Sequence, residues 1–125
     1  MARILLVEDD DAVRTFVSRA LMIDNHDVIT AENGADALGI LNEDDRFDLL
    51  VSDIKMPVMD GIALALNVAR DHPYLSILLM TGYADQRERA DGLDKIVEDV
   101  VLKPFSLAQI REAVSDTLKK ISQAA

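Results

Sequence analysis

Five short apolar runs alternate along the chain with segments in which apolar residues recur at helical spacing. An unbroken apolar run is typical of a strand covered by helices on both faces, and recurrence at i, i+3, i+4 and i+7 is typical of an amphipathic helix. The predicted strands are residues 3–7, 27–31, 48–53, 76–80 and 100–102. The alternation predicts an α/β fold with a doubly wound sheet of five parallel strands. Residues 27–31 are the least apolar run, so we expect that strand at a sheet edge.

Capping residues and apolar stripes place helices between these strands. The expected N-terminal caps are Asp10 or Asp11, Asn33, Asp60, and the capping box formed by Ser106 and Gln109. The expected buried positions are Val13, Phe16, Val17, Ala20 and Leu21; Gly34, Ala37, Leu38 and Leu41; Ile62, Ala65, Leu66 and Ala69; and Leu107, Ile110, Val114, Leu118 and Ile121. His72-Pro73 is expected to end the third helix, and residues 122–125 are expected to fray.

The segment from Asp85 to Asp99 has a weaker helical pattern. Its apolar stripe is thin, comprising Ala90, Leu93, Ile96 and Val97, and Gly92 weakens a helix by about 1 kcal/mol relative to alanine. We expect a short, loosely held helix here, which would bring the number of helices to five. Just before it, Gly82 is expected to allow a tight turn after the fourth strand.

Polar side chains follow four of the five predicted strands. They are Glu8 and Asp9, Asp53, Thr81, and Lys103. Because the carboxyl ends of parallel strands meet at one edge, where ligands bind in open α/β sheets, we expect these groups to converge. Pro57 turns the backbone away after Asp53, so this carboxylate is expected to be displayed rather than buried.

Three carboxylates brought together with one lysine leave an excess of negative charge that a divalent cation would neutralise. Carboxylate and carbonyl oxygens suit Mg²⁺. Asp53 can then act as a nucleophile toward phosphorus, as carboxylates do in acyl-phosphate intermediates. Lys103 and the cation would offset charge on the transferring phosphoryl group, and Thr81 would donate a hydroxyl to it.

Composition narrows the classes of function. The chain has 125 residues, the size of one domain, so we expect no fused output domain. With 13 Lys plus Arg against 23 Asp plus Glu, its net charge of −10 disfavours binding to nucleic acid or to an anionic membrane. It has no cysteine for disulfides or thiolate metal sites, and no apolar run near the roughly 20 residues of a membrane span. We therefore expect a cytoplasmic protein.

From about Arg3 to Leu118 the chain resembles the receiver domains of two-component response regulators. The resemblance rests on an ordered set of motifs: Glu8-Asp9, Asp53 with Met56-Pro57 and Asp60-Gly61, Thr81-Gly82, and Lys103-Pro104-Phe105. It implies a flavodoxin-like sheet in the order 2-1-3-4-5 and a cis bond before Pro104. We expect a single receiver domain over residues 1–125, with its core at about residues 3–121.

The resemblance also implies a function. Asp53 would accept a phosphoryl group from a histidine kinase or a histidine phosphotransfer protein. Glu8, Asp9, Asp53 and the Lys55 carbonyl would hold Mg²⁺. The domain would promote only its own phosphorylation and dephosphorylation, and would act by switching its binding to a downstream protein.

Some features depart from this pattern or narrow it. Val100 stands three positions before the lysine, where many receivers have an aromatic switch residue, and Tyr83 is a candidate substitute. Glu8 stands where aspartate is commoner. Residues 81–84, Thr-Gly-Tyr-Ala, resemble the CpdR group of stand-alone receivers, which controls delivery of substrates to a ClpXP-type protease.

Two other functions remain as alternatives. A magnesium-dependent phosphohydrolase would also use an aspartyl nucleophile, but enzymes of the haloacid dehalogenase type have a second acid two residues later, where this chain has Lys55. A pseudo-receiver would bind partners without phosphorylation, and the complete acidic set argues against it. A flavin-binding module ranks lower, because three acids at the sheet edge would repel the flavin phosphate.

Overall fold

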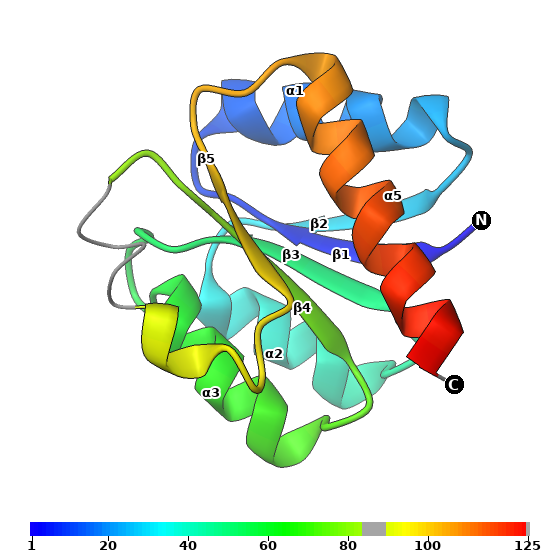
Figure 1. Ribbon diagram of the computed structural model, residues 1–125. Helices are drawn as coiled ribbons and strands as arrows, with labels where there is room; N and C mark the ends of the chain where they lie inside the picture. The colour runs from blue at the N-terminus through cyan, green and yellow to red at the C-terminus, as the bar shows by residue number, and fades with distance from the viewer. Residues whose placement is uncertain (84–89, 125) are drawn as a thin grey trace.

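A single parallel sheet runs through the centre of the molecule (Figure 1). The computed structural model describes residues 1–83 and 90–124. The strands are β1 (Arg3–Val7), β2 (Asp27–Ala31), β3 (Leu49–Asp53), β4 (Ser76–Thr81) and β5 (Asp99–Leu102). Their order is β2-β1-β3-β4-β5, so the predicted doubly wound topology and the edge position of β2 are confirmed.

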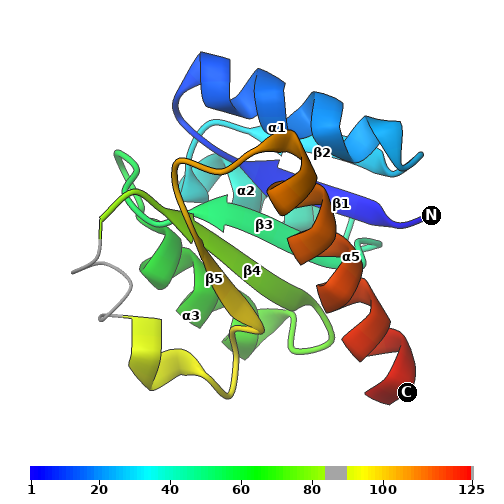
Figure 2. The same cartoon turned by 45° about the horizontal axis from the view of Figure 1, so that its top comes forward.

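Two helices cover each face of this sheet in the described part of the chain. Figures 1 and 2 show α1 (Asp11–Ile23) and α5 (Leu107–Ala124) on one face and α2 (Gly34–Glu43) and α3 (Gly61–Asp71) on the other. Of the fifth helix predicted over 85–99, residues 85–89 lie outside the described residues. Residues Asp91–Leu93 form the 3₁₀ helix η1. Fraying from residue 122 was also expected, but α5 continues to Ala124.

The strands bury alternate side chains on opposite faces, as the pleat requires. Ile4 and Leu6 of β1 belong to the core beneath α1 and α5. Leu5 and Val7 belong to the core beneath α2 and α3. The predicted stripe of the segment after residue 89 is confirmed, because Ala90 and Val97 are buried in this second core.

The capping predictions are confirmed, whereas parts of the predicted helix faces are wrong. Asp10 caps α1, and Ser106 and Gln109 form a reciprocal capping box, with N···O distances of 2.7 and 3.0 Å. In α3 the sheet-facing positions include Leu64 and Val68, and Leu66 is half exposed. Two other predicted core residues, Phe16 and Leu107, are exposed. The predicted core residues that are only half-buried are Val13, Leu38, Ala69, Leu118 and Ile121.

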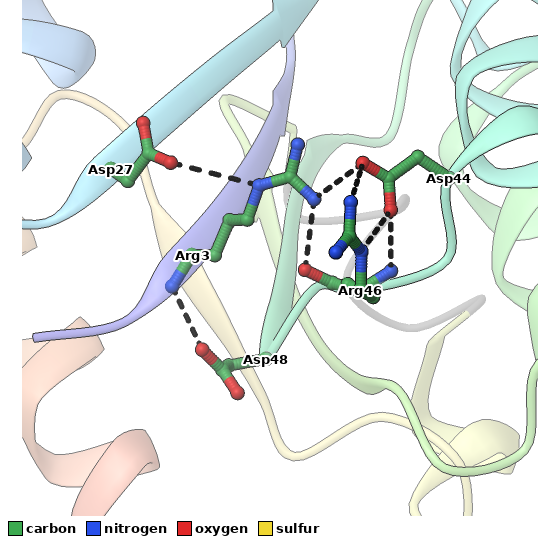
Figure 3. Close-up of polar contacts among 5 residues, drawn as sticks. All are labelled: Arg3, Asp27, Asp44, Arg46 and Asp48. Carbon is green, nitrogen blue, oxygen red and sulfur yellow. Dashed lines mark hydrogen bonds and ion pairs between the residues drawn. The ribbon is translucent and has the colours of Figure 1, made fainter.

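At the amino-terminal edge of the sheet, Arg3 ties three segments together (Figure 3). Its guanidinium Nη1 donates to Asp44 Oδ2 and to the Arg46 carbonyl, both at 3.0 Å. Its Nε lies 3.6 Å from Asp27 Oδ2, and its backbone N–H donates to Asp48 Oδ2 at 2.8 Å. This network joins the start of β1 to β2 and to the connection between α2 and β3. The predicted site lies at the opposite, carboxyl edge of the sheet.

Candidate functional site

Strand register brings the predicted polar groups to the carboxyl edge of the sheet. Val7 pairs with Ser52, so the next residues, Glu8 and Asp53, come level with each other. Asp53 pairs with Met80, one residue before Thr81. Thr81 in turn pairs with Leu102, and the Lys103 N–H donates to the Thr81 carbonyl at 2.8 Å. The predicted convergence of these strand ends is confirmed.

Glu8, Asp9 and Asp53 form a compact group of acids. Each offers a carboxylate oxygen, and the three oxygens lie within 4.8 Å of one another. Asp9 is exposed, but Asp53 is only 6% exposed and Glu8 only 1%. The prediction that Asp53 is displayed was wrong: Glu8, directly after β1, and Lys103, directly after β5, lie beside its carboxylate. Solvent reaches the group on the side of Asp9.

Lys103 bridges the two buried acids. Its Nζ lies 2.5 Å from Glu8 Oε1 and 3.1 Å from Asp53 Oδ1. The Lys103-Pro104 peptide bond is cis, as the resemblance implied. One ammonium group thus contacts two of the three acids that surround it.

Burial dominates the electrostatics of this group. Desolvation raises the pKa of Asp53 and of Glu8 above their ordinary values, although Lys103 pulls both pKa values down. The nearby charge of Asp9 raises the pKa of Asp53 further. Burial alone would lower the pKa of Lys103, but its contacts with Glu8 and Asp53 raise it overall. The lysine favours the ionised form of both acids, and burial opposes that form more strongly.

Thr81 is fully buried, and its hydroxyl bonds to the backbone of Tyr83. The Tyr83 N–H donates to Thr81 Oγ1 at 3.1 Å, and Oγ1 lies 3.4 Å from the Tyr83 carbonyl. The backbone bends at Gly82, where a tight turn was expected, and the φ of this glycine is not positive. The only residues with positive φ in the described ranges are Asn25 (64°) and Val58 (69°).

Lys55 and Tyr83 border the acids from two neighbouring loops. Both line a pocket together with Glu8, Asp9, Asp53 and Lys103. The Lys55 ammonium lies over the Tyr83 ring, 4.7 Å from its centroid. The Tyr83 side chain is half exposed, whereas Val100, at the expected switch position, is half-buried against the core beneath α2 and α3.

Gly61 holds the start of α3 against the backbone of Asp53. Its N–H donates to the Ile54 carbonyl at 2.7 Å, and a Cβ built on Gly61 would lie 2.2 Å from the Asp53 carbonyl oxygen. From the sequence, Gly61 was singled out only as part of the motif Asp60-Gly61. The glycine that directly follows a helix cap, eight residues after Asp53, was the available signal for this close approach.

A family model for the response regulator receiver domain matches residues 4–115. The chain belongs to this family. Among curated relatives, the sensor kinase CckA of Brucella abortus (strain 2308) is 37% identical over 120 residues, which cover 95% of this chain and 13% of that protein. The response regulator MprA of Mycobacterium avium (strain 104) is 35% identical over 118 residues, covering 94% of this chain and 51% of that protein. This chain thus spans only 13% of the length of CckA and about half of the length of MprA.

Solved structures support the same fold for this receiver domain. The chemotaxis response regulator CheY4 of Vibrio cholerae has a TM-score of 0.84 and 28% identity, covering 94% of this chain and 98% of that one. The response regulator TrrA of Thermotoga maritima, solved in complex with Mg(2+)-BeF, has a TM-score of 0.83 and 29% identity, covering 94% and 99%. Within residues 1–83 and 90–124, no helix is long and apolar enough to cross a membrane.

Proposed function

We propose that Asp53 of this receiver domain accepts a phosphoryl group from the phosphohistidine of a kinase or of a phosphotransfer protein. The observation that carries this proposal is the position of Lys103, whose Nζ lies 3.1 Å from Asp53 Oδ1 within a cluster of three acids. A buried carboxylate beside a fixed cation and at a pocket is suited to attack phosphorus. Membership of the receiver family supports the same function.

In the proposed reaction, one oxygen of the Asp53 carboxylate forms a bond to phosphorus while the bond from phosphorus to the donor imidazole nitrogen breaks. The electron pair of that bond stays on the imidazole, which takes up a proton, and the product is an acyl phosphate on Asp53. Lys103 offsets charge on the phosphoryl oxygens. The Thr81 hydroxyl, after leaving the Tyr83 carbonyl, donates to one of them.

The acidic cluster fits a hard divalent cation. Its three carboxylate oxygens lie within 4.8 Å of one another, and the exposure of Asp9 leaves room for water on the cation. We propose Glu8, Asp9, Asp53 and the Lys55 carbonyl as the residues that hold Mg²⁺. When bound, Mg²⁺ supplies the positive charge that three acids and one lysine lack.

Phosphorylation of Asp53 would change the binding of a downstream protein. The phosphoryl group adds charge, and movement of the Thr81 hydroxyl toward it would pull on the segment that leads into η1. We propose that the altered surface is the face formed by residues 90–99, β5 and α5. The proposal that the downstream partner is a ClpXP-type protease or its substrates is supported only by the Thr-Gly-Tyr-Ala sequence at 81–84. Residue 84 lies outside the described residues.

Intact-mass measurement after incubation with acetyl phosphate and Mg²⁺ tests the acceptor. The wild-type chain is expected to gain the mass of one phosphoryl group, and Asp53→Asn is expected to gain none. Asp94→Asn, which changes an exposed acid outside the cluster, is the matched control and should behave as wild type. A mass gain in Asp53→Asn would show that another group is the acceptor.

The same samples distinguish the phosphohydrolase alternative. A hydrolase would release inorganic phosphate from unactivated phosphate monoesters over many turnovers. The receiver function predicts no such release, because an unactivated alkoxide is a poorer leaving group than the acyl or imidazole group. Sustained Asp53-dependent turnover of a monoester would refute the proposed receiver function and support the phosphohydrolase alternative.

A further inference from the structure

Tyr83 contacts two parts of the site through two parts of its own structure. Its backbone N–H and carbonyl bond to the Thr81 hydroxyl, at 3.1 and 3.4 Å. Its ring lies against the Lys55 ammonium, with Nζ 4.7 Å from the ring centroid. Tyr83 therefore connects the loop after β3, which carries Lys55, to the hydroxyl at the end of β4.

This connection borders the pocket that contains the acceptor. Lys55 comes two residues after Asp53, and Tyr83 comes two residues after Thr81. Both residues line the pocket around the acidic cluster. Because Tyr83 is 51% exposed, core packing does little to fix its ring, and the Lys55 ammonium is a specific contact that holds it.

The bonds of the Thr81 hydroxyl oppose the step proposed above. A threonine hydroxyl has a single hydrogen to donate, and in this structure the acceptor is the Tyr83 carbonyl. To donate to a phosphoryl oxygen on Asp53, the hydroxyl must give up that acceptor. Any contact that keeps Tyr83 in place stabilises the arrangement in which the hydroxyl is already bonded.

We propose that the contact between Lys55 and Tyr83 is a latch that retains the Thr81 hydroxyl on the Tyr83 backbone and so opposes the switched state. The inference rests on the proposed function of Asp53, and it makes Lys55 and Tyr83 positioning residues for Thr81. A contact present in only one of two states shifts their equilibrium by its own free energy. For a partly exposed cation–π contact, the shift is about two- to fivefold.

Tyr83→Leu is the principal test, because it removes the ring without changing charge near the site. Calorimetry with Mg²⁺ and beryllofluoride, a mimic of the acyl phosphate, should give about two- to fivefold tighter binding to this variant than to wild type. Tyr83→Phe keeps the ring and is the matched control, which should bind as wild type. Equal affinity in Tyr83→Leu and wild type would overturn the latch.

A second readout isolates the latch from direct attraction between Lys55 and the anion. NMR of the Thr81 methyl group and its χ1-sensitive couplings, with neither Mg²⁺ nor beryllofluoride present, reports only on the hydroxyl's own equilibrium. Tyr83→Leu and Lys55→Met should shift these signals by the same amount, toward those of the beryllofluoride complex. Lys55→Arg, which keeps the cation, should restore the wild-type signals.

The double variant Lys55→Met, Tyr83→Leu decides whether the two residues act through one contact. If they do, its Thr81 signals should match those of either single variant, because each substitution removes the same interaction. Additive shifts would mean that the residues act separately, and the latch would be wrong. Absence of beryllofluoride binding to wild type would instead refute the proposed function, and unchanged Thr81 couplings in all variants would refute the latch itself.

Discussion

The Lys103 ammonium lies closer to Glu8 than to Asp53, at 2.5 Å from Glu8 Oε1 against 3.1 Å from Asp53 Oδ1. The other oxygen of Glu8, Oε2, accepts the backbone N–H of Asp10 at 3.2 Å. Both oxygens of this buried carboxylate therefore already have a donor. A cation that binds at Glu8 competes with Lys103 for the same side chain.

Removal of the lysine should therefore strengthen Mg²⁺ binding. Lys103→Met keeps most of the side chain's length but removes a positive charge that opposes the cation and occupies Glu8. We expect roughly tenfold tighter binding in a calorimetric titration at low ionic strength. Lys119→Met, at an exposed position of α5, is the matched control and should bind as wild type. Weaker binding to Lys103→Met would mean that the lysine helps to build the cation site.

The raised pKa of Asp53 predicts a gain in stability when the charge is removed. A carboxyl whose folded-state pKa lies above its ordinary value of 3.8 binds more protons in the folded than in the unfolded state. Its favourable contribution is present at low pH and is lost as pH rises through the folded-state pKa. In a chelator at pH 7, Asp53→Asn should raise the free energy of unfolding by about 1 kcal/mol.

Urea denaturation at two pH values tests this sign. The difference between Asp53→Asn and wild type should shrink as the pH is lowered toward 4, because the wild-type carboxyl then becomes protonated. Asp9→Asn changes the exposed acid of the cluster and should alter stability less. If the stability difference between Asp53→Asn and wild type grew on acidification, burial of Asp53 would not be the main cause of its raised pKa. Addition of Mg²⁺ should stabilise wild type more than Asp53→Asn, because the ion needs the carboxylate.

His72 is a second buried polar group whose replacement should stabilise the domain. In residues 1–83 and 90–124, its Nε2 is the one buried side-chain nitrogen or oxygen without a hydrogen-bond partner. His72→Leu removes this desolvated nitrogen at similar volume and should raise the free energy of unfolding by about 1 kcal/mol. Tyr74→Phe is the counterpart: it loses a 2.8 Å bond to the Asp45 carbonyl and should lower stability by about 0.5 to 1.5 kcal/mol. A destabilised His72→Leu would show that the contacts of the His72 ring with Tyr74 outweigh the unpaired nitrogen.

The sheet and the convergence of its polar ends follow from sequence because both depend on local patterns. Apolar runs define the strands, parallel topology aligns their carboxyl ends, and Asp53 is therefore placed beside Glu8. The burial of Asp53 was not predicted, since it depends on how closely the side chains of Glu8 and Lys103 approach it. On α3, Ile62 and Ala65 are buried as predicted, but Leu64 is buried in place of Leu66. Both leucines are apolar, so only packing decides between them. Thr81 was expected to donate its hydroxyl to a phosphoryl oxygen, and the local bonds of this hydroxyl to the backbone of Tyr83, two residues later, were not predicted.

The absence of a side chain at Gly61 sets how closely α3 approaches the acceptor. A methyl group there would lie 2.2 Å from the Asp53 carbonyl oxygen and 2.9 Å from Ile54 Cα. Both neighbours are backbone atoms, which cannot move aside as a flexible side chain would. Gly61→Ala should therefore push the start of α3 away from β3 and break the bond from the Gly61 N–H to the Ile54 carbonyl.

The expected loss is about 1 to 3 kcal/mol in the free energy of unfolding, as for other overpacked positions. Phosphorylation of Asp53 by acetyl phosphate should also slow, because displacement of the loop after β3 moves Lys55 and the acceptor relative to Lys103. Gly39→Ala is the matched control, since a Cβ there meets nothing within 4 Å in the interior of α2. It should raise stability by about 0.5 to 1 kcal/mol and leave the rate of phosphorylation unchanged. If Gly61→Ala gave the same gain as Gly39→Ala, the close approach of α3 to Asp53 would not hold in solution.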